Sequence, residues 1–278
     1  MIRHLFTLKA KAFAIHFGIS FAIFIILLYF IIFHWYPTPF FTTDGGWQGI
    51  RLIVFVDLVL GPALTFVVFN PIKKTTRHLK MDLSLIAVCQ IAALVWGTWV
   101  VHNERPYLVV FSDQTFYGLP YYQIKETGLA KSDLSKFGHT APIKVFTNMP
   151  AHPDERLVIF NRAMEKKVPP HFLSEYYRPF DKKSLQKLVS SGIKMTTFLK
   201  GKDSIANRRY EKFAQKYSSQ LENLLFFPLR ARYGKFIVAL NKESLEFIDV
   251  LNIEPPVIDE WEGNENYIRK LKQQKSLK

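Results

Sequence analysis

Three long apolar runs dominate the first hundred residues of the chain. They extend over residues 12–36, 52–69 and 83–101, and the first of them contains no formal charge. At about 1.5 Å per residue, the first run makes roughly 37 Å of helix, more than the roughly 30 Å hydrocarbon core of a bilayer. The pattern therefore predicts three transmembrane α-helices, over about 12–36, 51–70 and 83–101.

The first run is predicted to be an uncleaved anchor and not a signal peptide. Its basic flank (Arg3, Lys9, Lys11) suits either, but the apolar stretch is long and ends in HWYPTPFF. That ending offers no small-residue cleavage site.

The pattern changes after the third run. Short alternating or apolar stretches predict strands at 107–112 and 142–147 and an antiparallel three-stranded meander over 226–253. Helices are expected at 153–167, 182–191 and 206–223. The predicted fold class is a membrane protein with three transmembrane α-helices followed by an α+β domain. The expected domains are the transmembrane domain 1–104, the α+β domain 105–263 and a polar basic tail, 264–278.

Charge orients the helices. The chain has 37 Lys and Arg against 23 Asp and Glu, giving a net charge of +14, but residues 1–101 hold only eight of the basic side chains. The loop 70–82 carries four of them, and the loop 37–49 carries none. The positive-inside rule therefore places the N-terminus and the loop 70–82 in the cytoplasm, and the α+β domain outside it.

The exported half offers few signs of catalysis. It contains no G-x-S-x-G, H-E-x-x-H or Walker A motif, and its histidines lack metal-ligand spacing. The only cysteine, Cys89, falls in the third apolar run, where we expect a packing role. The basic residues of the exported half are spread along the chain. This distribution favours attraction to membrane lipids or to an acidic protein partner over binding of nucleic acid. We therefore predict no enzyme activity, no cofactor, no metal site and no nucleic-acid partner.

The unusual residues lie within the apolar runs. Arg51 can extend its guanidinium to the interface, but Asp57 is too deep and too short to do so. An intramembrane aspartate costs about 2.5–3.5 kcal/mol on insertion scales, so Asp57 should face protein. Gly61 shares its helix face, Pro62 loosens the adjacent backbone, and Gln90 on the third run could hydrogen-bond across. An internal helix–helix clasp is the favoured role for Asp57, ahead of contact with a partner helix and of proton or ion handling.

An intramembrane aspartyl protease pair of Asp57 and Asp82 is excluded. The two residues are predicted to lie nearly a membrane thickness apart, and paired catalytic carboxylates must be in near contact.

The first 120 residues resemble a known family. The stretch YPTPFFTTDGGWQGIRLIVFVDLVLGPALTFVVFNPIKK, followed by DLSLIAVCQIAAL and ERP, is similar to the TfpX/TfpZ family of type IV pilin accessory proteins. The resemblance implies a bacterial inner-membrane protein with a periplasmic domain, which stabilises a cognate type IV major pilin as a chaperone and promotes pilus assembly without being an enzyme. Motif residues that are candidates for partner binding or for organising the bundle are Trp47, Gln48, Arg51, Asp57, Gly61, Pro62, Gln90 and Arg105.

The family's client suits the predicted architecture. An unassembled pilin has one apolar N-terminal helix in the bilayer and a globular head in the periplasm. It also carries a glutamate near the start of that helix, at a depth comparable with His16, for which we nevertheless favour a packing role. Two other functions stay open: a membrane-anchored periplasmic scaffold or sensor that is not specific to pilin, and a pilin-modifying enzyme. The oligomeric state is also left open.

Overall fold

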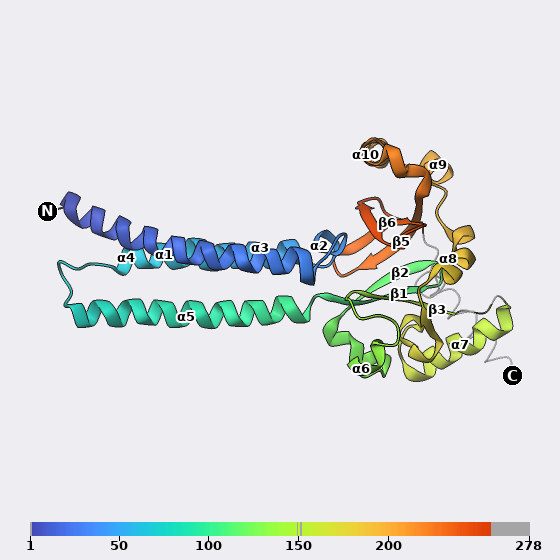
Figure 1. Cartoon of the computed structure of the whole chain (residues 1–278), viewed down its shortest axis with the longest axis horizontal. Helices are drawn as coiled ribbons and strands as arrows, with labels where there is room; N and C mark the ends of the chain where they lie inside the picture. The colour runs from blue at the N-terminus through green and yellow to red at the C-terminus, as the bar shows by residue number, and fades with distance from the viewer. Residues whose placement is uncertain (1, 149, 151, 257–278) are drawn as a thin grey trace, which may run out of the picture. The chain divides into compact units, whose positions relative to one another are not determined.

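The computed structural model describes residues 2–148, 150 and 152–256 (Figure 1). The chain forms two compact units. The helical unit contains residues up to Pro37 and Gly45–Arg105, and the α+β unit contains Thr38–Asp44 and the chain from Pro106 onward. The predicted tail 264–278 and the last residues of the predicted α+β domain lie outside the described residues.

The helical unit consists of three long apolar helices, as predicted. The first is α1 (Ile2–Phe30), which ends in the π-helical turn η1 (Ile31–Trp35). The second is continuous over Gly46–Val68 and comprises α3 (Gly46–Ile53), the π-helical segment η2 (Val54–Leu60) and α4 (Gly61–Val68). The third is α5 (Thr76–Asn103). All three are long and apolar enough to cross a membrane.

Each of these helices begins before its apolar run. α1 begins at Ile2, ten residues before the first run, because polar side chains do not interrupt a helix. α5 begins where the hydroxyl of Thr75 accepts a hydrogen bond from the His78 N–H. Such a side chain satisfies a donor that the first helical turn leaves free, so the cap sets the start of the helix.

Large apolar side chains cover the outside of the helical unit. Phe33, Leu85 and Val88 are each more than 60% exposed. A water-soluble protein rarely presents such a continuous apolar surface, whereas lipid tails cover it without cost. This surface supports a membrane location for the unit.

Val101 of α5 is in contact with both of the other helices, near the end of the unit where Tyr36 lies. The Tyr36 hydroxyl donates a 2.8 Å hydrogen bond to the backbone carbonyl of Val101, and Tyr36 is 1% exposed. Gly49 lies against the same residue, since a Cβ atom on Gly49 would be 2.8 Å from a methyl carbon of Val101. Glycine is required there because the helices approach too closely for a side chain.

The α+β unit is built on one seven-stranded sheet with the order β4-β3-β1-β2-β5-β6-β7. The strands are β1 (Pro106–Ser112), β2 (Thr115–Pro120), β3 (Ile143–Thr147), β4 (Tyr177–Pro179), β5 (Leu224–Ala231), β6 (Gly234–Asn241) and β7 (Phe247–Leu251). β1 pairs antiparallel with β2 and parallel with β3, and β2 pairs parallel with β5. β5, β6 and β7 form the predicted antiparallel meander.

Short helices connect the strands. The α-helices are α6 (Lys131–Leu134), α7 (Pro153–Lys166), α8 (Lys182–Leu188), α9 (Met195–Phe198) and α10 (Ser204–Lys216). The 3-10 turns are η3 (Tyr121–Thr127), η4 (Pro170–Phe172), η5 (Ser174–Tyr176), η6 (Val189–Ser191), η7 (Leu199–Gly201) and η8 (Ser218–Asn223). The three predicted helices correspond to α7, to α8 with η6, and to α10 with η8.

The two faces of the sheet are both covered. On one face, alternate residues of β1, β5 and β6, such as Val109, Phe227 and Val238, form a core with Leu185 of α8. The other alternate residues pack in two clusters, one against α9, η7 and α10, the other against η3, α6 and η4. Alternation of side chains along a strand explains this division.

The segment between the first two apolar helices belongs to the α+β unit. It contains α2 (Phe40–Thr43), and Phe40 is 1% exposed, with ring contacts to Phe247 in the core of the sheet. The Thr43 carbonyl accepts a 3.1 Å hydrogen bond from the Tyr233 N–H. This segment lies within residues 1–104 of the chain but is part of the second compact unit.

Asp44 ends this segment and is 3% exposed. Its carboxylate accepts hydrogen bonds from the Thr43 hydroxyl at 2.6 Å and from the Arg232 N–H at 3.3 Å. Burial raises the pKa of the Asp44 carboxyl from 3.8 to about 6, although these hydrogen bonds and the charge of Arg232 oppose that rise. A Cβ atom on Gly118 would lie 3.2 Å from the Asp44 Oδ1 atom. The backbone of β2 therefore packs against the Asp44 carboxylate.

Candidate functional site in the helical unit

The backbone around Asp57 is π-helical. Pro62 has no N–H to continue the helical hydrogen bonds, and its ring would collide with the carbonyl four residues earlier. The Gly61 N–H reaches back five residues to the Val56 carbonyl, which is the hydrogen bond of a π-helix. Asp57 is in the middle of this segment and is also the central residue of the 23-residue helix Gly46–Val68.

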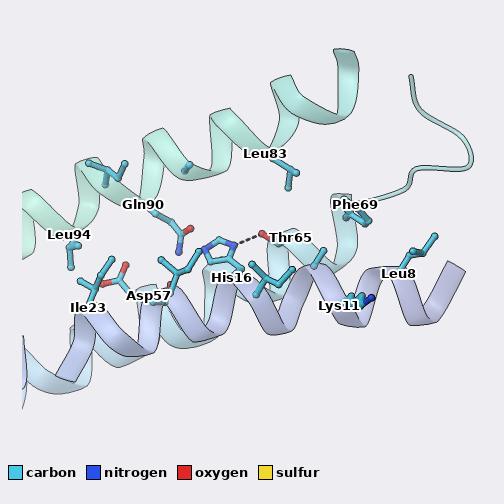
Figure 2. Close-up of a pocket in the computed structure, with 16 residues that line it drawn as sticks. Leu8, Lys11, His16, Ile23, Asp57, Thr65, Phe69, Leu83, Gln90 and Leu94 are labelled. Atoms are coloured by element: carbon cyan, nitrogen blue, oxygen red, sulfur yellow. Dashed lines mark hydrogen bonds between the residues drawn. The ribbon is translucent and has the colours of Figure 1, made fainter. Parts of the chain in front are cut away.

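Asp57 is buried without a hydrogen-bond partner among the described residues. It is 7% exposed and lines a cavity of about 640 Å³ between the three helices. Figure 2 shows the side chains of His16, Asp57 and Gln90 in the same space between the helices. No hydrogen bond or ion pair joins the Asp57 carboxylate to any residue in the described part of the chain.

His16 links the first helix to the second. Its Nδ1 atom and the Thr65 hydroxyl oxygen are hydrogen-bonded at 2.6 Å, and Thr65 is 3% exposed (Figure 2). Thr65 follows Asp57 by eight residues and Gly61 by four. Such spacing places all three residues on one face of a helix, a signal that could have identified Thr65 from the sequence.

Gln90 packs directly on Gly61. A Cβ atom on Gly61 would lie 1.6 Å from the Gln90 Nε2 atom, so glycine is what admits this side chain. The Gln90 amide makes no hydrogen bond to Asp57, nor to any other residue that the structure describes. Among the polar side chains that line the cavity, Asp57 and Gln90 thus lie close together and make no hydrogen bond to a described residue.

The remaining candidates form contacts apart from this cluster. The Arg51 guanidinium lies 5.0 Å from the centre of the Trp47 ring, and Gln48 is exposed. Arg105 is 8% exposed and hydrogen-bonds to the carbonyl and to the ring nitrogen of His102. The structure therefore brings Asp57, Gly61 and Gln90 together, with Pro62 shaping the backbone, and leaves the other four candidates outside the cavity.

Across the described ranges, no group of three or more His, Cys, Asp or Glu side chains is arranged to hold a metal ion.

His171 of the α+β unit stacks on Tyr117 with 3.8 Å between ring centres. Burial, together with the charge of Arg230, lowers the pKa of His171 to about 3, so its ring is neutral at physiological pH.

Three apolar helices around a buried carboxylate, joined in one chain to an α+β domain, define a membrane-associated protein with a polar site inside its helical unit. Over 111 residues, 40% of its length, the chain is 36% identical to the fimbrial assembly protein of Dichelobacter nodosus serogroup E1 and 35% identical to that of serogroup I. The matches span 43% of the length of each of these two relatives.

A third relative is matched over most of its length. The chain is 35% identical over 111 residues to the fimbrial assembly protein of Dichelobacter nodosus serogroups C1 and C2, and the match covers 84% of that protein. The chain belongs to the family of these fimbrial assembly proteins. No protein-family model matches the chain, and no solved structure matches it.

Proposed function

We propose that this protein is a non-enzymatic accessory of type IV pilus assembly, which acts as a chaperone for a cognate major pilin. Its relatives are named for fimbrial assembly and not for a catalytic activity. The motifs shared with the TfpX/TfpZ family favour the same function. The client is the pilin subunit before it enters the fibre.

The proposed location is the bacterial inner membrane, with the N-terminus in the cytoplasm and the α+β unit in the periplasm. The support is the apolar surface of the three helices and the four basic residues of the loop 70–82. Reporter enzymes fused after Pro120 and at Thr75 test the orientation. Activity of the Pro120 fusion in the cytoplasm would contradict it.

The main structural support for this function is the buried Asp57 carboxyl of the helical unit. Asp57 makes no hydrogen bond within the described residues, so the internal clasp lacks its bond. An unpaired carboxylate inside a bilayer is costly, which favours the alternative in which Asp57 meets a helix of another protein. A pilin supplies such a helix. In this proposal the helical domain contacts the pilin helix, and the α+β domain lies beside the pilin head.

Deletion of the gene tests the function. We expect the amount of assembled pili at the cell surface to fall while the pilin transcript stays unchanged, because a chaperone acts after synthesis. The measurement is sheared surface pilin against transcript level, with re-expression of the intact gene as the control. Normal surface piliation in a strain without a redundant homologue would refute the proposal.

A further inference from the structure

A groove runs along the helical unit between its first and third helices. α1 and α5 each pack on the second helix, and no extensive contact joins α1 to α5 in the described part of the chain. The 640 Å³ cavity lies between them, and a second cavity of about 460 Å³ lies further toward Trp35 and His102. Ile23 and Leu94 line both cavities, so the two form one groove.

The groove is long enough for a complete membrane-spanning helix. On α1 and η1 its lining residues extend from Leu8 to Trp35. At 1.5 Å per residue this corresponds to about 40 Å, which exceeds the roughly 30 Å hydrocarbon core. Most of the lining side chains are aliphatic or aromatic, so an occupant with a mainly apolar surface fits the groove.

Among the polar side chains that line the groove, Asp57 and Gln90 lie near its middle and define what we call its polar level. Asp57 is nine-tenths buried, lines the groove and lacks a hydrogen-bond partner among the described residues, and Gln90 lies beside it. Both residues are near the centres of their helices, the segments Gly46–Val68 and Thr76–Asn103. A carboxyl group keeps acceptor oxygens in either protonation state, so a donor on the occupant can pair with it.

We propose that this groove binds one apolar transmembrane helix, that of the pilin client, and that a hydrogen-bond donor near the middle of that helix pairs with Asp57. The assignment to pilin rests on the proposed function. The groove itself rests on its length, its apolar walls and the unpaired carboxylate at its centre.

A lipid is a poorer occupant for the same reasons. An acyl chain has no donor to offer Asp57 and covers only one leaflet, so two lipids would be needed end to end. A single helix satisfies the carboxylate, spans both cavities and lets α1 and α5 bury their facing sides at once. Helix association in membranes depends on such packing and on interhelical hydrogen bonds.

Photo-crosslinking in intact membranes tests the groove. A photoreactive amino acid replaces Ile23 or Ile91, which line the groove, in the full-length protein expressed with pilin. Matched controls replace Ile26 and Val88, which are 59% and 63% exposed but line neither cavity. We expect the two groove positions to crosslink to the apolar helix of pilin, mapped by mass spectrometry, at least five times more efficiently than the controls.

Two substitutions test the polar level. Asp57→Leu makes the site apolar and removes the acceptor, and the loss of one intramembrane hydrogen bond should lower the crosslink yield by about 3- to 20-fold. Asp57→Asn keeps a carbonyl acceptor and should retain the yield within about 2-fold. Accessory abundance is measured in the same membranes, so that a folding defect is recognised as such.

The outcomes separate the groove from the function. Adducts with lipid alone, with a second copy of this chain, or with equal yield at all four positions would overturn the groove. Pilin that co-purifies with the protein but crosslinks at neither groove position would overturn the groove and leave the proposed function standing. Groove adducts on the apolar helix of a protein other than pilin would overturn the proposed function and keep the groove as a helix-binding site. Equal loss of yield in both Asp57 variants would overturn the role of the acceptor.

Discussion

The two units differ in how their buried carboxylates are paired. In the α+β unit, the buried Asp44 carboxylate accepts two hydrogen bonds, and Asp249 accepts from both Lys216 and Tyr217. In the helical unit, Asp57 is similarly buried but accepts none within the described residues. The α+β unit pairs these two carboxylates within the chain, whereas in our proposal the Asp57 carboxylate of the helical unit receives its partner from another protein.

The surroundings of each unit explain why their buried carboxylates are paired differently. A water-exposed domain can hydrate an imperfectly paired carboxylate, and its loops and turns bring backbone donors to it. A membrane helix has already used its backbone donors internally, so an intramembrane carboxylate depends on other side chains. An unpaired polar group is consequently more informative in the helical unit than in the α+β unit.

The largest expected effect concerns the completeness of the α+β unit. Phe40 fills its core from a segment that lies between the first two helices. Phe40→Ala should destabilise this unit by about 3–5 kcal/mol, because the cavity left by a buried ring adds to the lost burial. Hydrogen exchange of β5 and β6 in the full-length protein measures the effect.

Val158→Ala is the control for this substitution, since Val158 is 62% exposed on α7. It should change protection of β5 and β6 by less than about 0.5 kcal/mol. If Phe40→Ala were equally neutral, the segment would be an accessory to the sheet and not part of its core.

The next effect tests the buried carboxylate of the α+β unit. The pKa of Asp44 is about 6 when folded and 3.8 ordinarily, so folding favours the neutral form. The stability that this preference contributes is fully present below pH 3.8 and is lost as the pH rises through about 6. A shift of about two pH units corresponds to an upper value of about 3 kcal/mol.

Hydrogen exchange of β6 at pH 5 and pH 7, corrected for the intrinsic exchange rate, should therefore show greater stability at pH 5. Asp44→Asn should remove most of that difference and stabilise the unit at pH 7. Glu243→Gln, at an exposed position, is the control and should leave the difference unchanged. A pH dependence that survives Asp44→Asn would assign it to another group.

Local pattern predicted much of this fold. The three helices follow from long apolar runs, and the meander follows from alternation over β5, β6 and β7. β4 was not predicted because it spans only three residues, and β2 was not predicted because its sequence, TFYGLP, contains a glycine and ends in proline. The turn between β1 and β2 consists of Asp113 and Gln114, both with positive φ, as in a type I′ hairpin, but lacks the Asn-Gly pair that signals this turn.

Long-range contacts escaped the sequence analysis. Nothing local to Phe40 indicates that it joins the core of a sheet that begins more than sixty residues later. The candidate site was partly predicted from the sequence. Asp57, Gly61 and Gln90 were selected from polarity and spacing, and the structure places them together. The hydrogen bond between His16 and Thr65 was not, because it depends on how two helices are placed side by side.

The smallest expected effect on stability is the most informative for the helical unit. Asp57 makes no hydrogen bond within the described residues, so Asp57→Leu removes no intramolecular bond. It also removes the cost of inserting a carboxylate. We therefore expect the unfolding free energy of the purified protein to change by less than about 0.5 kcal/mol or to rise slightly. The abundance of the protein in membranes should not fall.

An internal clasp predicts the reverse. Asp57→Leu would then lower the unfolding free energy by about 0.6 kcal/mol on average and by up to roughly 1.7, and Asp57→Asn would largely avoid this loss. Measuring both variants without pilin present isolates this term, because only contacts within the chain then contribute. A stability loss in Asp57→Leu that Asp57→Asn reverses would mean that the helical unit closes on itself, and the contrast with the α+β unit would disappear.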